Sequence, residues 1–207
     1  MKQFAHWTPR YAHDRLRLFA YTLTHPGAPW LAPGAVCFLD AWIQPHHTGF
    51  EWGSGRSTVW FSRRAARLTS IEHDEKWFRR VQQKLRANSC GGVEHRFVVV
   101  TDSNPLAYID AIAEVEDASL DFVLVDGLSA LRDSCALAAM PKVRAGGILI
   151  IDDVHRYMPS ESRAPLALPS GSEPPTPEWQ SAFRQLATWD MQRFSSGVTD
   201  TGIWIRK

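Results

Sequence analysis

At residues 50–58 the sequence reads Phe50-Glu51-Trp52-Gly53-Ser54-Gly55-Arg56-Ser57-Thr58, which is typical of a short strand that turns into a helix. Glycines let the backbone approach a ligand closely, and the first turn of a helix offers unpaired N–H groups. In an open α/β sheet, ligands bind in the crevice beyond the carboxyl ends of the strands. The stretch therefore predicts a ligand site at its two glycines. A glycine turn that only allows tight strand–helix packing is the alternative.

Strand-like and helix-like segments alternate on both sides of this turn. The expected strands are residues 49–52, 68–72, 96–100, 121–125 and 148–151, and the expected helices are 9–24, 35–43, 57–66, 75–87, 105–115 and 130–143. Three of the strands contain the wholly apolar runs FVVV, FVLV and ILII, as burial on both faces requires. The alternation predicts an α/β doubly wound fold, with a parallel sheet and helices on both faces.

The composition changes after the fifth strand. Residues 158–177 contain six of the thirteen prolines, and a long loop inside a compact fold is typical of a lid or binding loop. A helix (178–188) and an antiparallel edge hairpin (191–194 with 201–205) are expected to follow. The length of 207 residues favours one domain. It divides into an N-terminal helical cap (1–45), a cofactor-binding core (46–153), the proline-rich lid loop (154–178) and the C-terminal helix and hairpin (179–207).

Charge and composition exclude several classes of protein. Apolar residues are 44% and charged residues 22%, which excludes a disordered or fibrous chain. The net charge of +1 argues against nucleic acid as the main partner, because that binding neutralises many phosphates. No apolar run approaches the roughly 20 residues that span a membrane, and no signal peptide is visible. The three scattered cysteines fit a reducing compartment, so we expect a cytoplasmic protein.

Two acidic residues near the glycine turn help to decide which cofactor the predicted site would bind. Glu72 ends the second strand, 21 residues after Glu51, where it can accept hydrogen bonds from ribose hydroxyls. The dinucleotide fingerprint G-x-G-x-x-G needs a third glycine, and this chain has Thr58 there. Glu51 would repel a pyrophosphate but can hold an ammonium group. These features favour S-adenosylmethionine over NAD, with an NAD-binding oxidoreductase and a non-catalytic nucleotide-binding module as alternatives.

Four motifs occur in order: FEWGSGRST at 50–58, SIEHD at 70–74, DFVLVDG at 121–127 and GGILIIDD at 146–153. Over roughly residues 29–205 the chain thereby resembles the class I S-adenosylmethionine-dependent methyltransferases. The resemblance implies a seven-stranded Rossmann-like sheet whose last hairpin is antiparallel. It implies Glu51 and the glycine loop around the methionine moiety, Glu72 on the ribose and His73 beside the adenine. The full set of implied cofactor contacts is Trp30, Glu51, Gly53, Ser54, Gly55, Ser57, Glu72, His73, Asp102, Ser103 and Asp126.

Aspartates end the fourth and fifth strands, at Asp126 and at Asp152-Asp153. Adjacent strands lie about 4.8 Å apart, so these carboxylates can converge. With no Lys or Arg expected beside them, a hard divalent cation such as Mg²⁺ or Mn²⁺ would relieve their repulsion. The arrangement is similar to catechol-type and sugar-type metal-dependent O-methyltransferases, in which the metal lowers the pKa of the acceptor hydroxyl. Many relatives carry a histidine where this chain has Leu128 and Ser129. Alternatively, Asp126 contacts the cofactor and the other two aspartates only cap or face solvent.

The sequence thus predicts a methyltransferase that acts on a small molecule, through metal-assisted O-methylation with Asp152 as a catalytic residue. His155, two residues beyond the acid pair, has the pKa range of a general base. Metal-independent O- or N-methylation with His155 as the base is the main alternative. The expected partner is the small-molecule methyl acceptor, without nucleic acid or membrane, and a homodimer is left open.

Overall fold

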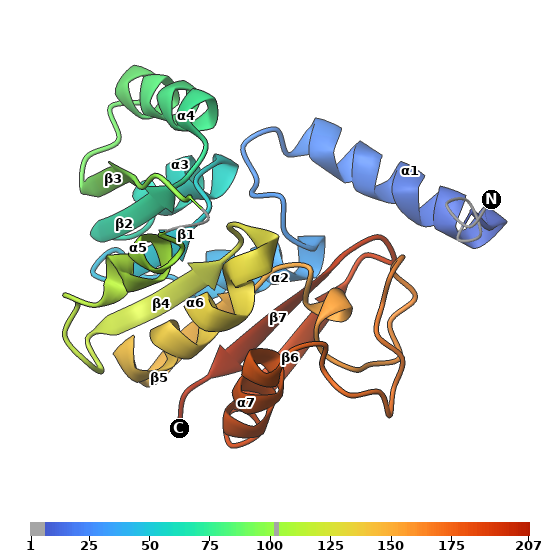
Figure 1. Ribbon diagram of the computed structural model, residues 1–207. Helices are drawn as coiled ribbons and strands as arrows, with labels where there is room; N and C mark the ends of the chain where they lie inside the picture. The colour runs from blue at the N-terminus through green and yellow to red at the C-terminus, as the bar shows by residue number, and fades with distance from the viewer. Residues whose placement is uncertain (1–6, 102–103) are drawn as a thin grey trace.

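The computed structural model describes residues 7–101 and 104–207. Within them, seven strands form one sheet in the order β3-β2-β1-β4-β5-β7-β6 (Figure 1). Strands β1 to β5 are parallel, whereas β7 is antiparallel to both β5 and β6. The predicted doubly wound sheet with an antiparallel last hairpin is confirmed. The strands are β1 Thr48–Trp52, β2 Arg67–Glu72, β3 Val93–Phe97, β4 Leu120–Val125, β5 Val143–Ile151, β6 Asp190–Ser195 and β7 Asp200–Ile205.

Helices cover both faces of the sheet because its central strands are apolar on both sides. On β4, Phe122 and Leu124 pack in one core with α2 and α3, whereas Val123 and Val125 pack in the other with α5, α6 and α7. The α-helices are α1 Pro9–Thr24, α2 Pro33–Trp42, α3 Arg56–Ser62, α4 Glu75–Ala87, α5 Leu106–Ile109, α6 Arg132–Ala139 and α7 Pro177–Leu186. Short 3₁₀ turns are η1 Asp110–Ile112, η2 Ser129–Leu131, η3 Met140–Lys142 and η4 Val154–Arg156. None of the helices in the described part of the chain is long and apolar enough to cross a membrane.

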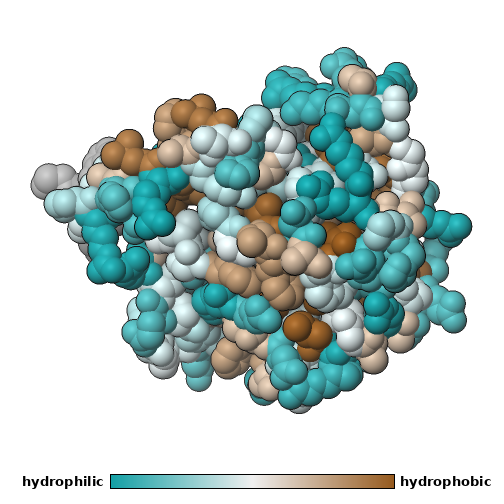
Figure 2. Space-filling model, turned by 180° about the vertical axis from the view of Figure 1, so that it is seen from behind, coloured by the Kyte–Doolittle hydropathy of each residue, from teal (hydrophilic) through white to brown (hydrophobic). Residues whose placement is uncertain are grey.

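Helix α1 lies apart from the sheet (Figure 1), and several of its apolar side chains are exposed. Its start is set by Thr8, whose hydroxyl accepts a hydrogen bond from the N–H of Tyr11 at 3.1 Å. Tyr11 is the one α1 residue that is buried, whereas Leu16, Phe19 and Leu23 are each more than 60% exposed. Hydrophobic side chains accordingly gather on the surface of this helix, beside the grey N-terminal residues in Figure 2. The helix is therefore attached to the body by only part of one face.

Several boundaries differ from those expected from sequence. The helix expected at 57–66 ends at Ser62, the helix expected at 105–115 is divided into α5 and η1 and ends at Ile112, and the strand expected at 148–151 begins at Val143. The third strand was expected at 96–100, but β3 ends at Phe97 because its partner β2 ends at Glu72. The N–H of Val98 still bonds to the carbonyl of Glu72 at 2.8 Å, and the apolar run then leaves the sheet. The helix expected at 130–143 is divided into η2, α6 and η3. The α-helix gives way to η3 after Ala139 because Pro141 cannot donate the hydrogen bond that a continuing α-helix needs.

The proline-rich segment is folded against the body. The N–H of Leu168 donates to the carbonyl of His155 at 2.7 Å, and the N–H of Ser160 donates to the carbonyl of Leu168 at 3.1 Å. Met158 and Ala164 are buried. The segment thus has apolar anchors that its composition does not suggest. Its role as a lid stays a prediction.

Candidate cofactor site

A cavity of about 600 Å³ opens at the carboxyl ends of β1, β2 and β4. Its walls come from the glycine turn, the start of α4, the end of β4 and the segment before α2. The lining residues are Trp30, Gly53, Ser54, Gly55, Arg56, Ser57, Glu72, His73, Asp74, Lys76, Trp77, Arg80, Asp126 and Gly127. All the sequence-predicted cofactor residues in the described part of the chain line this cavity except Glu51. Asp102 and Ser103 lie outside the described residues.

Gly53 gives the glycine turn its path. Its φ of +93° lies in the region that favours glycine, and a Cβ there would lie 2.6 Å from the carbonyl oxygen of Asp126. Its N–H donates to the carbonyl of Ile71 at 2.9 Å. The turn therefore lies directly against the ends of β2 and β4, which leaves the floor of the cavity open to a ligand.

Glu72 is 2% exposed, and its carboxylate accepts four hydrogen bonds. Its Oε2 accepts hydrogen bonds from the N–H of Ser54 at 3.1 Å and from the hydroxyl of Ser54 at 2.8 Å. Its Oε1 accepts from the N–H groups of His73 and Asp74 at 2.9 and 3.0 Å. Although burial favours the neutral acid, these bonds and the His73 ring hold the pKa of Glu72 below its ordinary value. The carboxylate is therefore fixed and ionised, with its position set before any ligand binds.

Glu51 lies beneath the turn and is fully buried. Its Oε1 accepts hydrogen bonds from the hydroxyls of Thr58 and Ser70, the second at 2.7 Å. Its Oε2 has no hydrogen-bond partner within the described ranges. Burial raises the pKa of Glu51 to about 7, because the low-dielectric interior favours the neutral acid. This carboxyl group is consequently a buried acid that changes charge near neutral pH.

Aromatic and basic side chains form the rim of the cavity. The rings of Trp30 and Trp77 lie 6.2 Å apart between centroids. The guanidinium of Arg56 lies 5.2 Å from the Trp30 ring, and that of Arg80 lies 5.2 Å from the Trp77 ring. The indole N–H of Trp77 donates to the carbonyl of Ser54 at 2.6 Å, which fixes that ring to the glycine turn. Cationic groups over tryptophan faces make the rim attractive to planar and anionic ligand groups.

The rim residues of α4 were missed by reasoning from the sequence. Lys76, Trp77 and Arg80 lie in the first two turns of the helix that follows Glu72. The signal was present, because a helix that starts directly after a strand-end acid presents its first turns to the same edge of the sheet.

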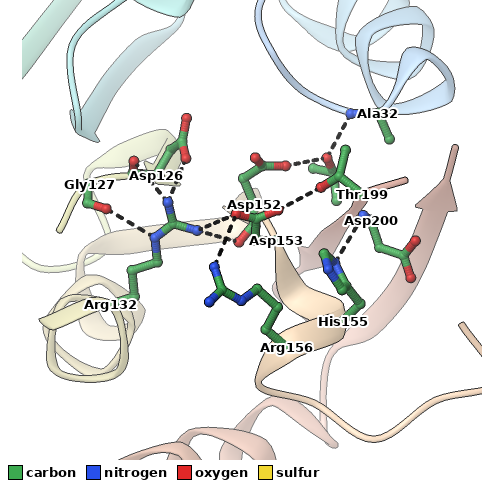
Figure 3. A network of polar contacts seen from close by, with 11 residues as sticks. Ala32, Asp126, Gly127, Arg132, Asp152, Asp153, His155, Arg156, Thr199 and Asp200 are labelled. Carbon is green, nitrogen blue, oxygen red and sulfur yellow. Dashed lines mark hydrogen bonds and ion pairs between the residues drawn. The ribbon is translucent and has the colours of Figure 1, made fainter. Parts of the chain in front are cut away.

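Figure 3 shows the aspartates at the ends of β4 and β5 around the guanidinium of Arg132. Its Nη2 donates to Asp126 Oδ1 at 2.9 Å, and its Nη1 lies 3.6 Å from Asp153 Oδ2. The expectation that no basic side chain lies beside these carboxylates is therefore wrong. Arg132 was missed because it lies six residues after Asp126, at the start of α6.

Asp152 and Asp153 are also committed to neighbouring hydroxyls. Asp152 Oδ1 accepts a hydrogen bond from Thr201 at 2.7 Å, and the Thr201 hydroxyl accepts one from the N–H of Ala32 at 2.9 Å. Asp153 Oδ1 accepts a hydrogen bond from Thr199 at 2.7 Å. These bonds join β5 to the start of β7 and to α2.

The donor set does not fit the magnesium or manganese site expected at Asp126, Asp152 and Asp153. A cation already lies between Asp126 and Asp153, and the Asp152 carboxylate is bound to a threonine. Across residues 7–101 and 104–207, no group of three or more His, Cys, Asp or Glu side chains is arranged to hold a metal ion.

His155 lies on η4 and is 3% exposed. Its Nδ1 accepts a hydrogen bond from the N–H of Asp200 at 3.2 Å, and burial lowers its pKa. It does not line the cofactor cavity. As a general base it would therefore need movement of the surrounding segment to reach an acceptor.

Comparisons with known proteins agree with this geometry. A family model described as a methyltransferase domain matches residues 50–154, about half of the chain. A Staphylococcus aureus protein assigned as a caffeoyl-CoA O-methyltransferase is 15% identical, with a TM-score of 0.59 over 94% of this chain and 91% of that one. The O-methyltransferase TomG from Streptomyces achromogenes, solved with S-adenosylmethionine, is 18% identical, with a TM-score of 0.54 over 79% and 74%. An rRNA methylase from Streptococcus thermophilus is 9% identical, with a TM-score of 0.56 over 82% and 92%.

No curated protein matches the sequence. The identities of the solved structures are low, so these likenesses concern the fold. The family model, in contrast, covers the glycine turn, Glu72 and all three strand-end aspartates. The chain therefore belongs to the methyltransferase-domain family and is a class I S-adenosylmethionine-dependent methyltransferase.

Proposed function

We propose that this methyltransferase methylates a hydroxyl group of a small molecule. The observation that carries the proposal is the cavity lined by the fixed, ionised Glu72, by the Gly53 turn and by Asp126. In this proposal S-adenosylmethionine lies along the cavity, with its ribose hydroxyls on Glu72 and its methionine end at the glycine turn. The cofactor contacts are Trp30, Gly53, Ser54, Gly55, Ser57, Glu72, His73 and Asp126.

The carboxyl oxygen of Glu51 that has no partner among the described residues supports the proposal that the ammonium group of S-adenosylmethionine lies nearby, although Glu51 does not line the cavity itself. A cation close to this buried acid would favour its ionised form, because an opposite charge lowers the pKa of a carboxyl group.

The transfer step moves one methyl group and one proton. An electron pair of the acceptor oxygen forms the O–CH₃ bond as the C–S bond of the sulfonium breaks, and that bonding pair stays on sulfur as the neutral thioether S-adenosylhomocysteine. The hydroxyl proton leaves to a base or to water. The chain contributes mainly by holding donor and acceptor in line and by excluding water, which lowers the entropic barrier.

A second, smaller cavity supports the proposal that the methyl acceptor is a small molecule. Its volume is about 140 Å³, and it shares Trp30 and Arg56 with the cofactor cavity. Its other walls include Leu18 and Tyr21 of α1, and it reaches Thr199, which is bound to Asp153. A cavity of about 150 Å³ holds one benzene ring, so a single-ring phenol is of suitable size. The net charge of +1 supports a small molecule over nucleic acid.

The first test is calorimetry with S-adenosylhomocysteine and with NAD. We expect saturable binding of the first and none of the second. Binding of NAD alone would overturn the proposal.

The second test is a panel of single-ring phenols, aliphatic alcohols and anilines, incubated with S-adenosylmethionine and read by mass spectrometry. We expect O-methylated phenols. If the only products are methylated on nitrogen, the proposed reaction is N-methylation and not O-methylation.

A further inference from the structure

Arg132 is the first residue of α6, and its side chain is 7% exposed. Its donors point to the ends of two adjacent strands (Figure 3). Nε donates to the carbonyl of Gly127 at 3.1 Å, and Nη1 donates to the carbonyl of Asp152 at 2.9 Å. Nη2 donates both to the carbonyl of Asp126 at 3.2 Å and to its carboxylate at 2.9 Å. The guanidinium is therefore held in a fixed position by four hydrogen bonds.

The same guanidinium supplies the positive charge of the cluster. It lies between the carboxylates of Asp126 and Asp153, at 2.9 and 3.6 Å. Arg156 adds a second, more exposed guanidinium 4.0 Å from Asp153 Oδ2. A guanidinium stays charged at every physiological pH and presents its donors in a rigid plane. Two of the three neighbouring carboxylates, those of Asp126 and Asp153, thus receive charge compensation from the chain itself.

We propose that Arg132 takes the place of a divalent cation, so that methyl transfer at this site is independent of metal. The inference rests on the proposed function for its catalytic meaning, but the claim about the cluster can be tested without turnover. Arg132 acts as a positioning residue: it fixes Asp126 at the edge of the cofactor cavity and Asp153 beside Thr199 of the smaller cavity. A lysine could keep the charge but not the four bonds, because it lacks the planar fork.

Manganese is the probe, because free Mn²⁺ gives an electron paramagnetic resonance signal that broadens on binding. Wild-type protein saturated with S-adenosylhomocysteine is titrated with Mn²⁺. We expect the manganese to stay free. Arg132→Met, which removes the cation and keeps much of the side-chain volume, is expected to bind about one Mn²⁺ per chain at the uncovered carboxylates. Arg156→Met is the matched control, since it removes the other guanidinium beside Asp153, and its manganese is expected to stay free.

Stoichiometric binding of Mn²⁺ to the wild type, abolished by Asp153→Asn, would overturn the proposal. Manganese that stays free with a folded Arg132→Met variant would overturn it as well, because the carboxylates would then form no cation site. If Arg132→Met does not fold, Arg132→Lys replaces it. Lysine keeps the charge, so Mn²⁺ should still be excluded, and binding of Mn²⁺ to this variant would count against the proposal.

A second measurement uses activity on a phenol that the panel identifies. We expect less than a two-fold change in rate with EDTA and with added Mg²⁺, and loss in EDTA with recovery in Mg²⁺ would overturn the proposal. Failure of the proposed function is recognised separately, since it would appear as absent binding of S-adenosylhomocysteine. The manganese titration of the ligand-free protein would still report on the cluster.

Discussion

Glu51→Gln is expected to remove a specific pH dependence of folding stability. Glu51 is fully buried, and its Oε2 has no hydrogen-bond partner in the part of the chain described. The ordinary pKa of 4.5 is raised to about 7 by burial. Since the folded state favours the protonated acid, this stability is fully present below pH 4.5 and is lost as the pH rises through about 7.

The size of the effect follows from the two pKa values. One pKa unit corresponds to about 1.4 kcal/mol, so full ionisation of Glu51 costs the folded state about 3 kcal/mol. Part of this is already lost at pH 5. Between pH 5 and pH 8 the free energy of unfolding of the wild type should therefore fall by about 2–3 kcal/mol relative to that of Glu51→Gln. Glutamine matches the protonated acid in size and keeps an acceptor for Thr58 and Ser70.

The assay is urea unfolding of both proteins at pH 5, 6, 7 and 8, without ligand. Other titrating groups are common to both proteins and cancel in the difference. Glu161→Gln, on an exposed residue, is the control and should track the wild type at every pH. A difference between wild type and Glu51→Gln that stays constant from pH 5 to pH 8 would refute the reasoning, because Glu51 would then keep one charge state throughout.

Three further outcomes are expected. Glu72→Gln should weaken S-adenosylhomocysteine binding by roughly ten- to hundred-fold in calorimetry, because a fixed charged acceptor is lost, whereas the exposed Glu75→Gln should bind as the wild type does. An unchanged affinity of Glu72→Gln for S-adenosylhomocysteine would show that Glu72 does not bind the ribose hydroxyls. Gly53→Ala should lower the free energy of unfolding by about 1–3 kcal/mol, since its φ is +93° and its Cβ would meet the Asp126 carbonyl. In Gly55→Ala the new Cβ meets only the Trp77 ring, at 4.0 Å, so this variant should have the free energy of unfolding of the wild type. An equal loss of stability in both variants would contradict the conclusion that the backbone conformation of Gly53 requires glycine. In limited proteolysis, cofactor with a phenol acceptor should slow cleavage within residues 158–177, as expected of a lid; an equal rate of cleavage there with and without these ligands would show that the segment is only a connection.

The parts of the fold that depend on local pattern could be predicted from the sequence. The helices at 9–24 and 75–87 were predicted with the bounds that the structure has, because a threonine or aspartate cap marks each start. The sheet could be predicted because apolar runs on the central strands leave no alternative to burial on both faces. The part of the cavity wall that lies at the strand ends, from Gly53 to Gly55, at Glu72 and at Asp126, could be predicted from the rule that ligands bind at the carboxyl ends of parallel strands.

The direction of single side chains could not be predicted. Arg132 is an ordinary helix residue in the sequence, and only the fold turns its long side chain back over the ends of β4 and β5. His155 was expected on the rim of the crevice, two residues after the acid pair. Asp153 adopts a left-handed conformation with a φ of 53°, and the 3₁₀ turn after it carries His155 against Asp200. Such reversals depend on one residue and leave no periodic pattern.

The loose attachment of α1 links the folding of that helix to the existence of the smaller cavity. An isolated helix of 16 residues is marginal in water, so α1 cannot detach and remain helical. The backbone amides of α1 should therefore exchange with solvent deuterium through local unfolding, whereas exchange of the amides of the central strands requires global unfolding. Leu18 and Tyr21 form a wall of the smaller cavity only while α1 is folded. The acceptor would thus bind to a fraction of the molecules, and its affinity would include the free energy of folding one helix.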